Sequence, residues 1–426
     1  MTSWNITGHQ LPYRGTLQVP GDKSISHRAI MFGAAAQGTT TVENFLTGED
    51  CLHTVSIFQQ LGVKIDVEGT NVVIQSEGFH AWKRPHAPLD AGNSGTTARL
   101  LLGLLAPSTI EAEITGDRYL RARPMNRIVD PLRQMNASIE GKTDQLPLTV
   151  RGRSLRPIVY HPPVASAQVR SAVLLARCHT DGTTTAIERA KTRDHTERLL
   201  EDFGVFVKED GLSVSIDGPV QLEATKVIVP GDISSAAFFL VGAAMTPGSD
   251  LTLQRVGLNE TRTGIIDVLR AMGANLEISN VSTTGEKYGD IRIQYAPLRA
   301  ITLDDEALIP RLIDELPLIA LLATQAEGTT IIRNAEELRV KETDRIDAVV
   351  NVLRTFGANI SPLDDGFHIE GKTPLTGGVV DTYGDHRIGM MAAIAAKRAT
   401  GETTITNPSC IAISYPQFAK DLETIQ

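Results

Sequence analysis

Two carboxylates in the second half of the chain have residue types and settings suited to acid–base chemistry. Asp314 precedes the apolar run LPLIALLA, and we expect it at a helix start, where it either caps backbone N–H groups or accepts a proton from a substrate hydroxyl. Glu342 lies beside Lys341 and Arg345, whose charges favour its ionised form and argue against a general acid at neutral pH. His386 is the nearby residue type that titrates near neutral pH. The sequence leaves the choice of proton donor and acceptor open.

Basic residues accompany several predicted helix starts. Lys341 and Arg345 are four residues apart in RVKETDRID, so a helix beginning there would place both on one face. The alternative for this segment is a solvated face with Glu–Arg pairs. An arginine fork binds phosphate and carboxylate groups through two parallel hydrogen bonds. The cations indicate an anionic substrate with phosphate and carboxylate groups; they are Lys23, Arg28, Arg123, Arg193, Lys341, Arg345 and Arg387.

The elements that must position these residues are helices that begin with polar or basic residues. Taken singly, each start fits an ordinary helix cap. If the helices are related by pseudo-symmetry, their N-termini converge on one surface of each domain, and the positive ends of their dipoles gather where an anion would bind. The starts are PGDKSISHR, AGNSGTTAR, SAQVRSA and YGDHRIGMM.

One supersecondary unit recurs six times along the chain. A small-residue helix runs into a Gly-Thr-Thr-like turn and a short β-branched strand, with a spacing of roughly 65 to 80 residues. We therefore expect an α/β (α+β) fold built from β-α-β-α-β-β repeats, five complete and the last truncated. A solenoid is the usual outcome of such periodicity, but repeats with two helices each are longer than solenoid repeats. The second helices end where a left-handed residue would stop them, at Gly62, Asn136, Gly204, Gly273 and Gly357.

Two segments with the same beginning divide the chain. QVPGDKSISHR and IVPGDISSAAF share Val-Pro-Gly-Asp before a serine-containing helix start, which indicates the same position in two halves of a duplicated protein. Pro20 and Pro230 are therefore the predicted crossover points between two domains of three repeats with pseudo-threefold symmetry. We expect one domain over 20–229 and a second over 1–19 and 230–426.

Composition excludes several classes of protein. The 426 residues are 42% hydrophobic and 21% charged, as in globular proteins of two or three domains. A formal net charge of −9 argues against nucleic-acid or acidic-membrane partners. Cys51, Cys178 and Cys410 have no paired spacing, which argues against a disulfide framework or a zinc site. The N-terminal segment lacks the features of a signal peptide and the apolar runs are short, so we expect a cytoplasmic location. P-loop, dinucleotide and metalloprotease motifs are missing, which weakens nucleotide-phosphate, dinucleotide and metal binding as alternatives.

Six motifs in a fixed order make the sequence similar to the 5-enolpyruvylshikimate-3-phosphate synthase family. They are PGDKSISHRA, AGNSGTTAR, RARPMNRIVDPL, SAQVRSA, RVKETDRI and GDHRIGM, and TRDHTERLL resembles the second of the family's two sequence classes. The resemblance covers essentially the whole chain. It implies transfer of the enolpyruvyl group of phosphoenolpyruvate to the 5-hydroxyl of shikimate 3-phosphate, with release of phosphate, on the route to chorismate. It further implies no metal or organic cofactor, inhibition by glyphosate, and a protein that we expect to be a monomer.

The resemblance also assigns roles to residues. Domain 20–229 would hold most of shikimate 3-phosphate, and the second domain would supply catalytic and phosphoenolpyruvate contacts. Shikimate 3-phosphate contacts are implied for Ser24, Arg28, Ser166, Ala167, Gln168 and Arg193. Phosphoenolpyruvate contacts are implied for Lys23, Asn93, Gly95, Arg123, Arg345 and Arg387. Asp314 matches the hydroxyl-binding proton acceptor, Lys341 a second hydroxyl contact and Glu342 the candidate proton donor. His386 lies beside them, and Lys23 is a further candidate for proton transfer.

Two positions and two alternatives bear on this interpretation. Ile413 stands where first-class members carry a lysine, so a C-terminal cationic contact to phosphoenolpyruvate is in doubt. Gly95 stands where some glyphosate-tolerant members have alanine, which favours sensitivity. UDP-N-acetylglucosamine enolpyruvyl transferase is the nearest alternative, but GDRYLRARP (116–124) lacks its reactive cysteine. A non-catalytic anion-binding repeat protein is the second alternative, although it would have no need of Asp314, Glu342 and His386 together.

Overall fold

The computed structural model of the chain describes residues 3–163, 165–282 and 285–426. It divides into two compact units, which we call the insert unit (Gly21–Val229) and the terminal unit (Met1–Pro20 with Pro230–Gln426). Each unit has a hydrophobic core of its own. In the described residues no helix combines the length and apolarity needed to cross a bilayer.

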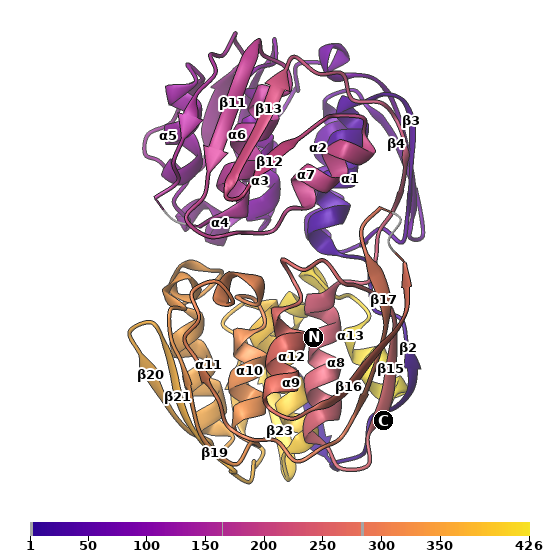
Figure 1. Cartoon of the computed structure of the whole chain (residues 1–426), viewed down its shortest axis with the longest axis vertical. Coiled ribbons are helices and arrows are strands. Elements are labelled where there is room, and N and C mark those ends of the chain that lie inside the picture. Colours follow the sequence, from indigo (N-terminus) through magenta and orange to yellow (C-terminus); the bar gives the residue numbers. More distant parts are fainter. Residues whose placement is uncertain (1–2, 164, 283–284) are drawn as a thin grey trace. The chain divides into compact units, whose positions relative to one another are not determined.

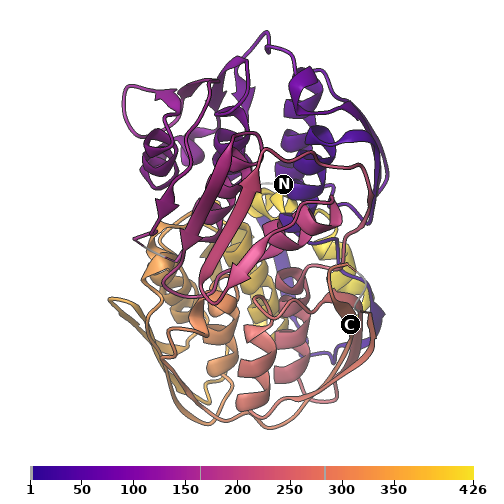
Figure 2. The same cartoon turned by 45° about the horizontal axis from the view of Figure 1, so that its top comes forward.

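Three sheets surround the core of the insert unit, and all have the same strand order. The first strand runs parallel to the second, which pairs antiparallel with the last strand of a hairpin. Figure 2 shows these sheets in the indigo-to-magenta part of the chain. Listed in sheet order, the strands are β14 (Lys226–Ile228), β3 (Gln37–Glu43), β5 (Asn71–Glu77) and β4 (Lys64–Glu68); β6 (Leu89–Asp90), β7 (Glu111–Thr115), β9 (Leu148–Arg151) and β8 (Ser138–Glu140); and β10 (Val159–Tyr160), β11 (Gly182–Ile187), β13 (Ser213–Gly218) and β12 (Lys208–Asp210).

The terminal unit repeats this strand order twice and then departs from it. Its third sheet has three strands, and β1 pairs antiparallel with β23 from Ser3↔Thr406 to Gly8↔Gly401. The N-terminal strand therefore completes the truncated sixth repeat. In sheet order the strands are β2 (Arg14–Leu17), β15 (Asp250–Gly257), β17 (Tyr288–Gln294) and β16 (Asn275–Ser282); β18 (Thr302–Leu303), β19 (Gly328–Ile332), β21 (Gly366–Gly371) and β20 (Asn359–Leu363); and β1 (Ser3–Gly8), β23 (Gly401–Thr406) and β22 (Val379–Asp381).

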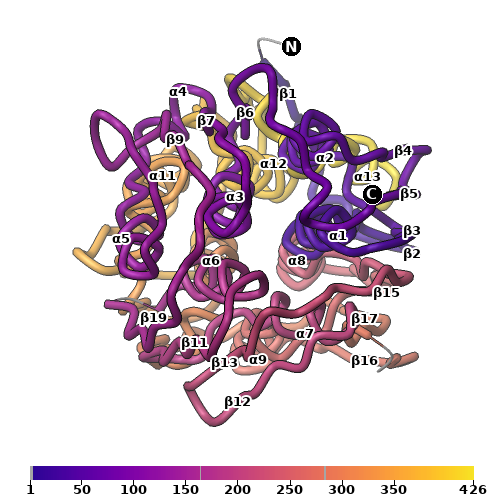
Figure 3. Tube along the Cα trace, turned by 90° about the horizontal axis from the view of Figure 1, so that it is seen from above, coloured from indigo at the N-terminus to yellow at the C-terminus, as the bar shows by residue number. Residues whose placement is uncertain are grey.

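Each repeat has an inner helix that is buried on nearly all sides. All eight residues of α10 and all thirteen of α8 are buried, as expected for helices that are apolar all round. Figure 1 shows α8, α10 and α12 side by side within the terminal unit, and Figure 3 shows α1, α3 and α6 within the insert unit. The inner helices are α1 (Lys23–Ala35), α3 (Gly95–Leu105), α6 (Ala167–Arg177), α8 (Ile233–Met245), α10 (Leu316–Ala323) and α12 (His386–Arg398).

The outer helices end as the sequence predicts. The residues expected to stop them all have positive φ, from 76° at Asn136 to 92° at Gly62 and Gly273, which confirms the left-handed C′ positions. The outer helices are α2 (Glu49–Gln60), α5 (Asn126–Gln134), α7 (His195–Asp202), α9 (Gly264–Ala271) and α11 (Arg345–Thr355). The short α4 (Arg118–Ala122), the C-terminal α13 (Phe418–Thr424) and the 3-10 turns η1 (Phe79–Ala81), η2 (Ile309–Arg311), η3 (Glu336–Val340) and η4 (Pro408–Ile413) complete the described elements.

The Gly-Thr-Thr turn has a simple physical basis. Its glycine has positive φ, for example 103° at Gly328 and 99° at Gly182, a conformation that costs a glycine little. The threonine two residues later is fully buried, as at Thr330 and Thr184, because alternate residues of the strand face the core. The turn thus ends the inner helix and sets which face of the next strand is buried. The structure confirms the predicted mixed α/β fold. The insert unit has three repeats with four-stranded sheets, and the terminal unit has two such repeats and a third whose sheet has three strands.

Candidate active site

The N-terminal ends of the three inner helices meet within the terminal unit. Ser234 near the start of α8 donates its hydroxyl proton to Glu315, the residue that precedes α10. Arg387 in the first turn of α12 places Nη1 3.9 Å from Glu315 Oε1 and Nη2 3.6 Å from Asp314 Oδ2. The predicted convergence of helix starts is therefore confirmed for this unit.

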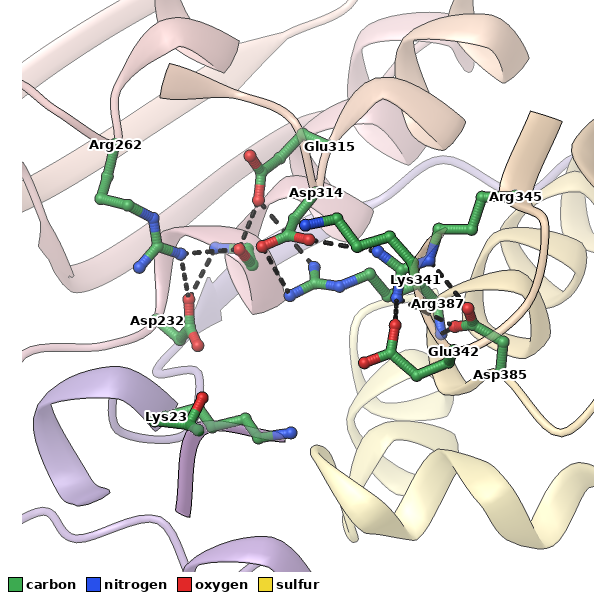
Figure 4. A network of polar contacts seen from close by, with 12 residues as sticks. Lys23, Asp232, Arg262, Asp314, Glu315, Lys341, Glu342, Arg345, Asp385 and Arg387 are labelled. Carbon is green, nitrogen blue, oxygen red and sulfur yellow. Dashed lines mark hydrogen bonds and ion pairs between the residues drawn. The ribbon is translucent and has the colours of Figure 1, made fainter. Parts of the chain in front are cut away.

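Arg345 at the start of α11 is the hub of the charged groups in the terminal unit (Figure 4). Its side chain is 1% exposed and contacts three carboxylates. Nε donates to Asp385 Oδ2 at 2.8 Å, Nη1 donates to Asp314 Oδ1 at 3.1 Å, and Nη2 donates to Glu342 Oε2 at 2.6 Å. One buried guanidinium thus fixes residues from three separate segments.

Asp385 has two functions at this hub. Its carboxylate is fully buried and accepts the backbone N–H of Arg387 at 2.8 Å, so it caps α12. The same oxygen also accepts from Arg345 Nη2 at 3.3 Å. Asp385 therefore links the first turn of α12 to the first turn of α11. His386, the next residue, is 4% exposed and begins α12.

The neighbouring carboxylates and burial shift the pKa values of the cations in the terminal unit. Burial lowers the pKa of Arg345, but Asp385, Glu342 and Asp314 more than reverse this and raise it above its ordinary value. Lys341 has the opposite balance, because burial lowers its pKa and the neighbouring carboxylates only partly oppose the effect. These cations are not bare, and an incoming anion must compete with carboxylates for them.

Two local expectations were wrong. Lys341 and Arg345 do not share a helix face, because Lys341 follows η3 in extended conformation and α11 begins only at Arg345. The cap is Asp344, which accepts the backbone N–H of Ile346 at 3.1 Å. Asp314 lies in a turn two residues before α10, where Glu315 holds the cap position. Asp314 thus contacts arginines from a turn and not from the helix start itself.

The N-terminal ends of the inner helices also meet within the insert unit. Gln168 in the first turn of α6 donates to Thr96 Oγ1 at 3.1 Å and accepts from Arg99 Nη1 at 2.6 Å, and both partners lie on α3. Arg28 on α1 donates to Ser171 Oγ on α6 at 3.1 Å. The predicted convergence is confirmed here as well.

The predicted phosphoenolpyruvate contacts of this unit lie at these helix starts. Lys23 Nζ forms an ion pair with Asp50 on α2, whose side chain is only 5% exposed. Asn93 donates to Asp117 Oδ2 at 2.8 Å. Gly95 is buried, and a Cβ there would lie 3.1 Å from Nη1 of Arg123. A side chain at this position would therefore require the guanidinium of Arg123 to move.

The predicted shikimate 3-phosphate contacts surround the start of α6. Arg28 is 3% exposed, and burial lowers its pKa to about 10 although Glu197 opposes the change. Its Nε donates to Thr196 Oγ1 at 2.7 Å, and its Nη1 donates to the carbonyl of Ser24 at 3.0 Å. Ser166 precedes α6, followed by Ala167 and Gln168, and all three are half-buried. Arg193 is half-buried, and its carbonyl accepts from Arg170 Nη2 at 2.6 Å.

Sequence reasoning missed five residues that hold the predicted site residues. Three of them are buried carboxylates paired with cations: Asp50, Glu315 and Asp385. The other two are arginines near inner-helix starts, the half-buried Arg99 and the buried Arg170. A carboxylate next to an apolar helix, as in DELPLIALLA, was the available signal for Glu315. Arg99 and Arg170 lie inside motifs that were singled out, AGNSGTTAR and SAQVRSA, but their partners are distant in sequence.

Among the residues described, neither the cysteines nor clusters of potential metal ligands form a further catalytic or metal-binding site. Burial raises the pKa of Cys178 to about 12 and of Cys410 to about 11, and Cys51 is also buried and reduced. These thiols fit the predicted role of small core residues. Within the described ranges, no group of three or more His, Cys, Asp or Glu side chains is arranged as metal ligands. Ile413 packs against the terminal-unit core and offers no cation.

Comparison with known proteins decides the family. The profile of EPSP synthase (3-phosphoshikimate 1-carboxyvinyltransferase) matches residues 9–422. The chain belongs to the EPSP synthase family. It is accordingly an enzyme, an enolpyruvyl transferase of the shikimate pathway.

Individual relatives agree with this EPSP synthase assignment along nearly the whole chain. A 3-phosphoshikimate 1-carboxyvinyltransferase from Geobacillus thermodenitrificans is 55% identical over 417 residues, which are 97% of this chain and 96% of the relative. The solved structure of an EPSP synthase from Acinetobacter baumannii matches with a TM-score of 0.90 at 42% identity, covering 100% of this chain and 98% of that one. An enolpyruvyl transferase from Streptomyces tendae shares the fold, with a TM-score of 0.82 at 20% identity and coverage of 99% and 97%.

Proposed function

We propose that this EPSP synthase family member transfers the enolpyruvyl group of phosphoenolpyruvate to the 5-hydroxyl of shikimate 3-phosphate with the residues described above. The insert unit would hold the shikimate 3-phosphate through Ser24, Arg28, Ser166, Ala167, Gln168 and Arg193. Phosphoenolpyruvate would contact Lys23, Asn93, Gly95 and Arg123 of that unit and Arg345 and Arg387 of the terminal unit. The proton acceptor would be Asp314 and the proton donor Glu342. Lys341 would contact a second hydroxyl, and His386 would lie beside these residues.

The arrangement around Arg345 carries the proposal. A buried arginine held by Asp314, Glu342 and Asp385 keeps two proton-transfer candidates at fixed positions on one cation. A binding protein for anions would gain nothing from surrounding its arginine with carboxylates, because these compete with the ligand. An enzyme that must add and remove protons needs both kinds of group together.

The first half of the reaction forms a tetrahedral adduct. A proton added to the methylene carbon of phosphoenolpyruvate leaves a cationic centre at its second carbon. The 5-hydroxyl oxygen attacks that centre and its proton passes to a base. We assign the base to Asp314, because Arg345 and Arg387 hold its carboxylate in a fixed orientation. Glu342 is the assigned donor, and it gains a proton readily only after the bound anion draws Arg345 Nη2 away from it.

The second half of the reaction restores the double bond. The methyl group of the adduct returns a proton to the Glu342 carboxylate, which gave up its proton in the first half, while the C–O bond to phosphate breaks and the leaving phosphate takes the electron pair of that bond. Arginines that contact phosphate oxygens stabilise the charge that develops on the leaving group. Arg123 and Arg345 supply this charge in the proposed arrangement. No covalent link between protein and substrate is required.

Three properties of the whole protein are part of the proposal. All assigned residues belong to one chain, so a monomer has a full set. A cytoplasmic location suits substrates that carry several charges, since such anions do not cross a bilayer unaided. Glyphosate would compete with phosphoenolpyruvate near Gly95, where a Cβ would approach Nη1 of Arg123 to 3.1 Å.

Release of inorganic phosphate tests the function. The purified chain is expected to release phosphate from a mixture of shikimate 3-phosphate and phosphoenolpyruvate, and the enolpyruvyl product should be identified by mass. UDP-N-acetylglucosamine in place of shikimate 3-phosphate serves as the matched acceptor control. Release with the uridine sugar alone would overturn the acceptor assignment. If no phosphate is released above background with either acceptor, the chain would be a non-catalytic anion-binding protein.

A further inference from the structure

Arg170 is a buried arginine to which the proposed reaction gives no role. It lies on α6, four residues after Ser166, and its side chain is 2% exposed. Its guanidinium contacts two buried carboxylates, Glu188 and Glu197, whose side chains are 2% and 1% exposed. Removing three charged groups from water is costly, and the cost is offset only where their mutual geometry and hydrogen bonds are good.

The partners of Arg170 bracket one segment of the chain. Glu188 follows β11, and Glu197 lies in the first turn of α7, so the segment 188–197 is held at both ends. Arg170 Nη1 donates to Glu188 Oε2, and Nε lies 2.6 Å from Glu197 Oε1. Between these two contacts, Nη2 donates to the backbone carbonyl of Arg193 at 2.6 Å. The guanidinium therefore fixes the backbone of Arg193, one of the residues assigned to bind shikimate 3-phosphate.

A second set of contacts joins the residues next to Arg170 and Glu197. Ser171 Oγ lies 2.6 Å from Thr196 Oγ1, and each hydroxyl also accepts from Arg28, at 3.1 Å and 2.7 Å. Ser171 follows Arg170 on α6, and Thr196 precedes Glu197 on α7. The paired positions 170–171 and 196–197 thus join α6 to the segment at the place where Arg28 is bound.

Glu188 also forms hydrogen bonds with a residue inside segment 188–197. Its Oε1 accepts from the hydroxyl of Thr192 at 2.5 Å and its Oε2 from the backbone N–H of Thr192 at 3.4 Å. Thr192 directly precedes Arg193. Burial raises the pKa of Glu197, and the charge of Arg170 opposes that rise, so the ionised state of Glu197 depends on the arginine.

We propose that Arg170 is a positioning residue for shikimate 3-phosphate. It holds segment 188–197, and with it Arg193, in register with the start of α6, where Ser166 and Gln168 are assigned to the same ligand. The inference rests on the proposed function, since it takes the ligand of Arg193 from there. Arg170 acts through the backbone of Arg193 and need not touch the substrate.

Lysine cannot replace Arg170 in this role. The hydrogen bonds to Glu188, to Glu197 and to the carbonyl of Arg193 are donated by Nη1 and Nη2 of a planar fork, and Nε adds a close ion-pair contact with Glu197. A lysine ammonium keeps the positive charge but offers its donors from a single point. R170K therefore retains the charge balance of the buried cluster and loses the geometry.

Arg177 provides a matched control on the same helix. It lies seven residues further along α6, is also buried, and donates to Thr180 Oγ1 at 2.7 Å and to the carbonyl of Gly218 at 2.9 Å. R177K removes a comparable set of contacts from the other end of α6. A general loss of stability would follow from either variant, whereas a specific loss of shikimate 3-phosphate affinity should follow only from R170K.

The test measures binding of shikimate 3-phosphate by calorimetry and steady-state kinetics on the full chain. For R170K we expect Kd and KM for shikimate 3-phosphate to rise about 10-fold or more, which is about 1.4 kcal/mol, while kcat and the KM for phosphoenolpyruvate change by less than about threefold. R177K should change Kd by less than about twofold. If R170K does not fold, E188Q is the second variant, with an expected rise of about threefold because one of the two carboxylates is neutralised.

A double-mutant comparison distinguishes positioning from plain structural support. On an R193A background R170K should have little further effect on Kd, since the residue through which it acts is already gone. An equal loss on both backgrounds would overturn the inference, as would unchanged shikimate 3-phosphate affinity in folded R170K or, where that variant does not fold, in E188Q. A wild-type chain that releases no phosphate from the two substrates would overturn the proposed function and this inference together. Turnover by the wild type with unchanged affinity in R170K would overturn this inference alone.

Discussion

Asp314 Oδ1 lies 3.1 Å from Nη1 of Arg345, and its other oxygen lies 3.6 Å from Nη2 of Arg387. The carboxylate therefore bridges two arginines that are assigned to the same substrate. Such a bridge has a cost for catalysis, because each cation makes the carboxylate a weaker base. It also has a benefit, because the two arginines hold the carboxylate in one orientation.

Replacement of Asp314 by alanine separates a catalytic role from a structural one. D314A should reduce kcat about 100-fold or more, the usual range for loss of a general base, with a much smaller effect on phosphoenolpyruvate binding. D314N keeps the shape and should show a similar loss of kcat with less effect on stability. Steady-state kinetics and binding by calorimetry check this. Equal losses in rate and in phosphoenolpyruvate affinity would instead indicate that Asp314 only orders the two arginines.

The local signals in the sequence predicted the repeats well. Gly62 and Asn136 illustrate this, because a helix stop needs only one residue that tolerates positive φ, and that preference is a property of the residue itself. The start of α11 was harder to predict. RVKETDRID offers both Glu342 and Asp344 as possible capping carboxylates; Asp344 forms the cap, and Glu342 is bound by Arg345.

Contacts between distant segments could not be predicted from local patterns. Glu315 pairs with Ser234, 81 positions away, and Arg345 pairs with Asp385, 40 positions away. Neither pair follows from helix or strand periodicity, because the partners meet only after the inner helices have packed. The resemblance to a family named the residues that contact substrate, but gave no account of Glu315 or Asp385, which hold those residues in place.

Lys23→Met tests the cation at the start of α1. We expect K23M to lose nearly all turnover, because a methionine of similar size removes the charge that the phosphoenolpyruvate anion would meet. The ion pair with Asp50 adds a stability effect, since K23M leaves a nearly buried carboxylate without that lysine. The expected cost is about 1–3 kcal/mol. Thermal unfolding should show that K23M/D50N recovers most of this loss without recovering turnover, and near-normal turnover in either variant would remove Lys23 from the mechanism.

Gly95→Ala should separate the inhibitor from the substrate. The new methyl would lie 3.1 Å from Nη1 of Arg123 and 3.3 Å from Nη1 of Arg99, so the two guanidinium groups must shift by a few tenths of an ångström. A bulkier or more rigid ligand tolerates that shift less well than phosphoenolpyruvate does. We expect the inhibition constant of glyphosate to rise at least about tenfold more than the KM for phosphoenolpyruvate. Inhibition assays at fixed shikimate 3-phosphate measure both, and parallel changes would show that the ligands do not differ at this position.

His27 gives the chain a pH dependence of stability that can be measured. The side chain is fully buried on α1, with Nδ1 2.8 Å from Thr54 Oγ1. Burial lowers its pKa well below the ordinary value, with further lowering by Lys23 and Arg28 and opposition from Asp22. Below about pH 6.5 the unfolded chain binds a proton at this histidine and the native chain does not, so stability falls as pH falls.

The expected size of this effect is set by the number of such histidines. Burial also lowers the pKa of His179 to about 3, so two histidines contribute over the same window. Each adds a loss of up to about 1.4 kcal/mol per pH unit below about pH 6.5. H27N removes one titrating group, so its free energy of unfolding should fall less steeply between about pH 6.5 and pH 5 than that of the wild type, by about one proton. Urea unfolding across this range measures the slopes, with the exposed His9→Asn as the matched control. Identical slopes for H27N and wild type would mean that His27 takes up its proton in the native state as readily as in the unfolded chain.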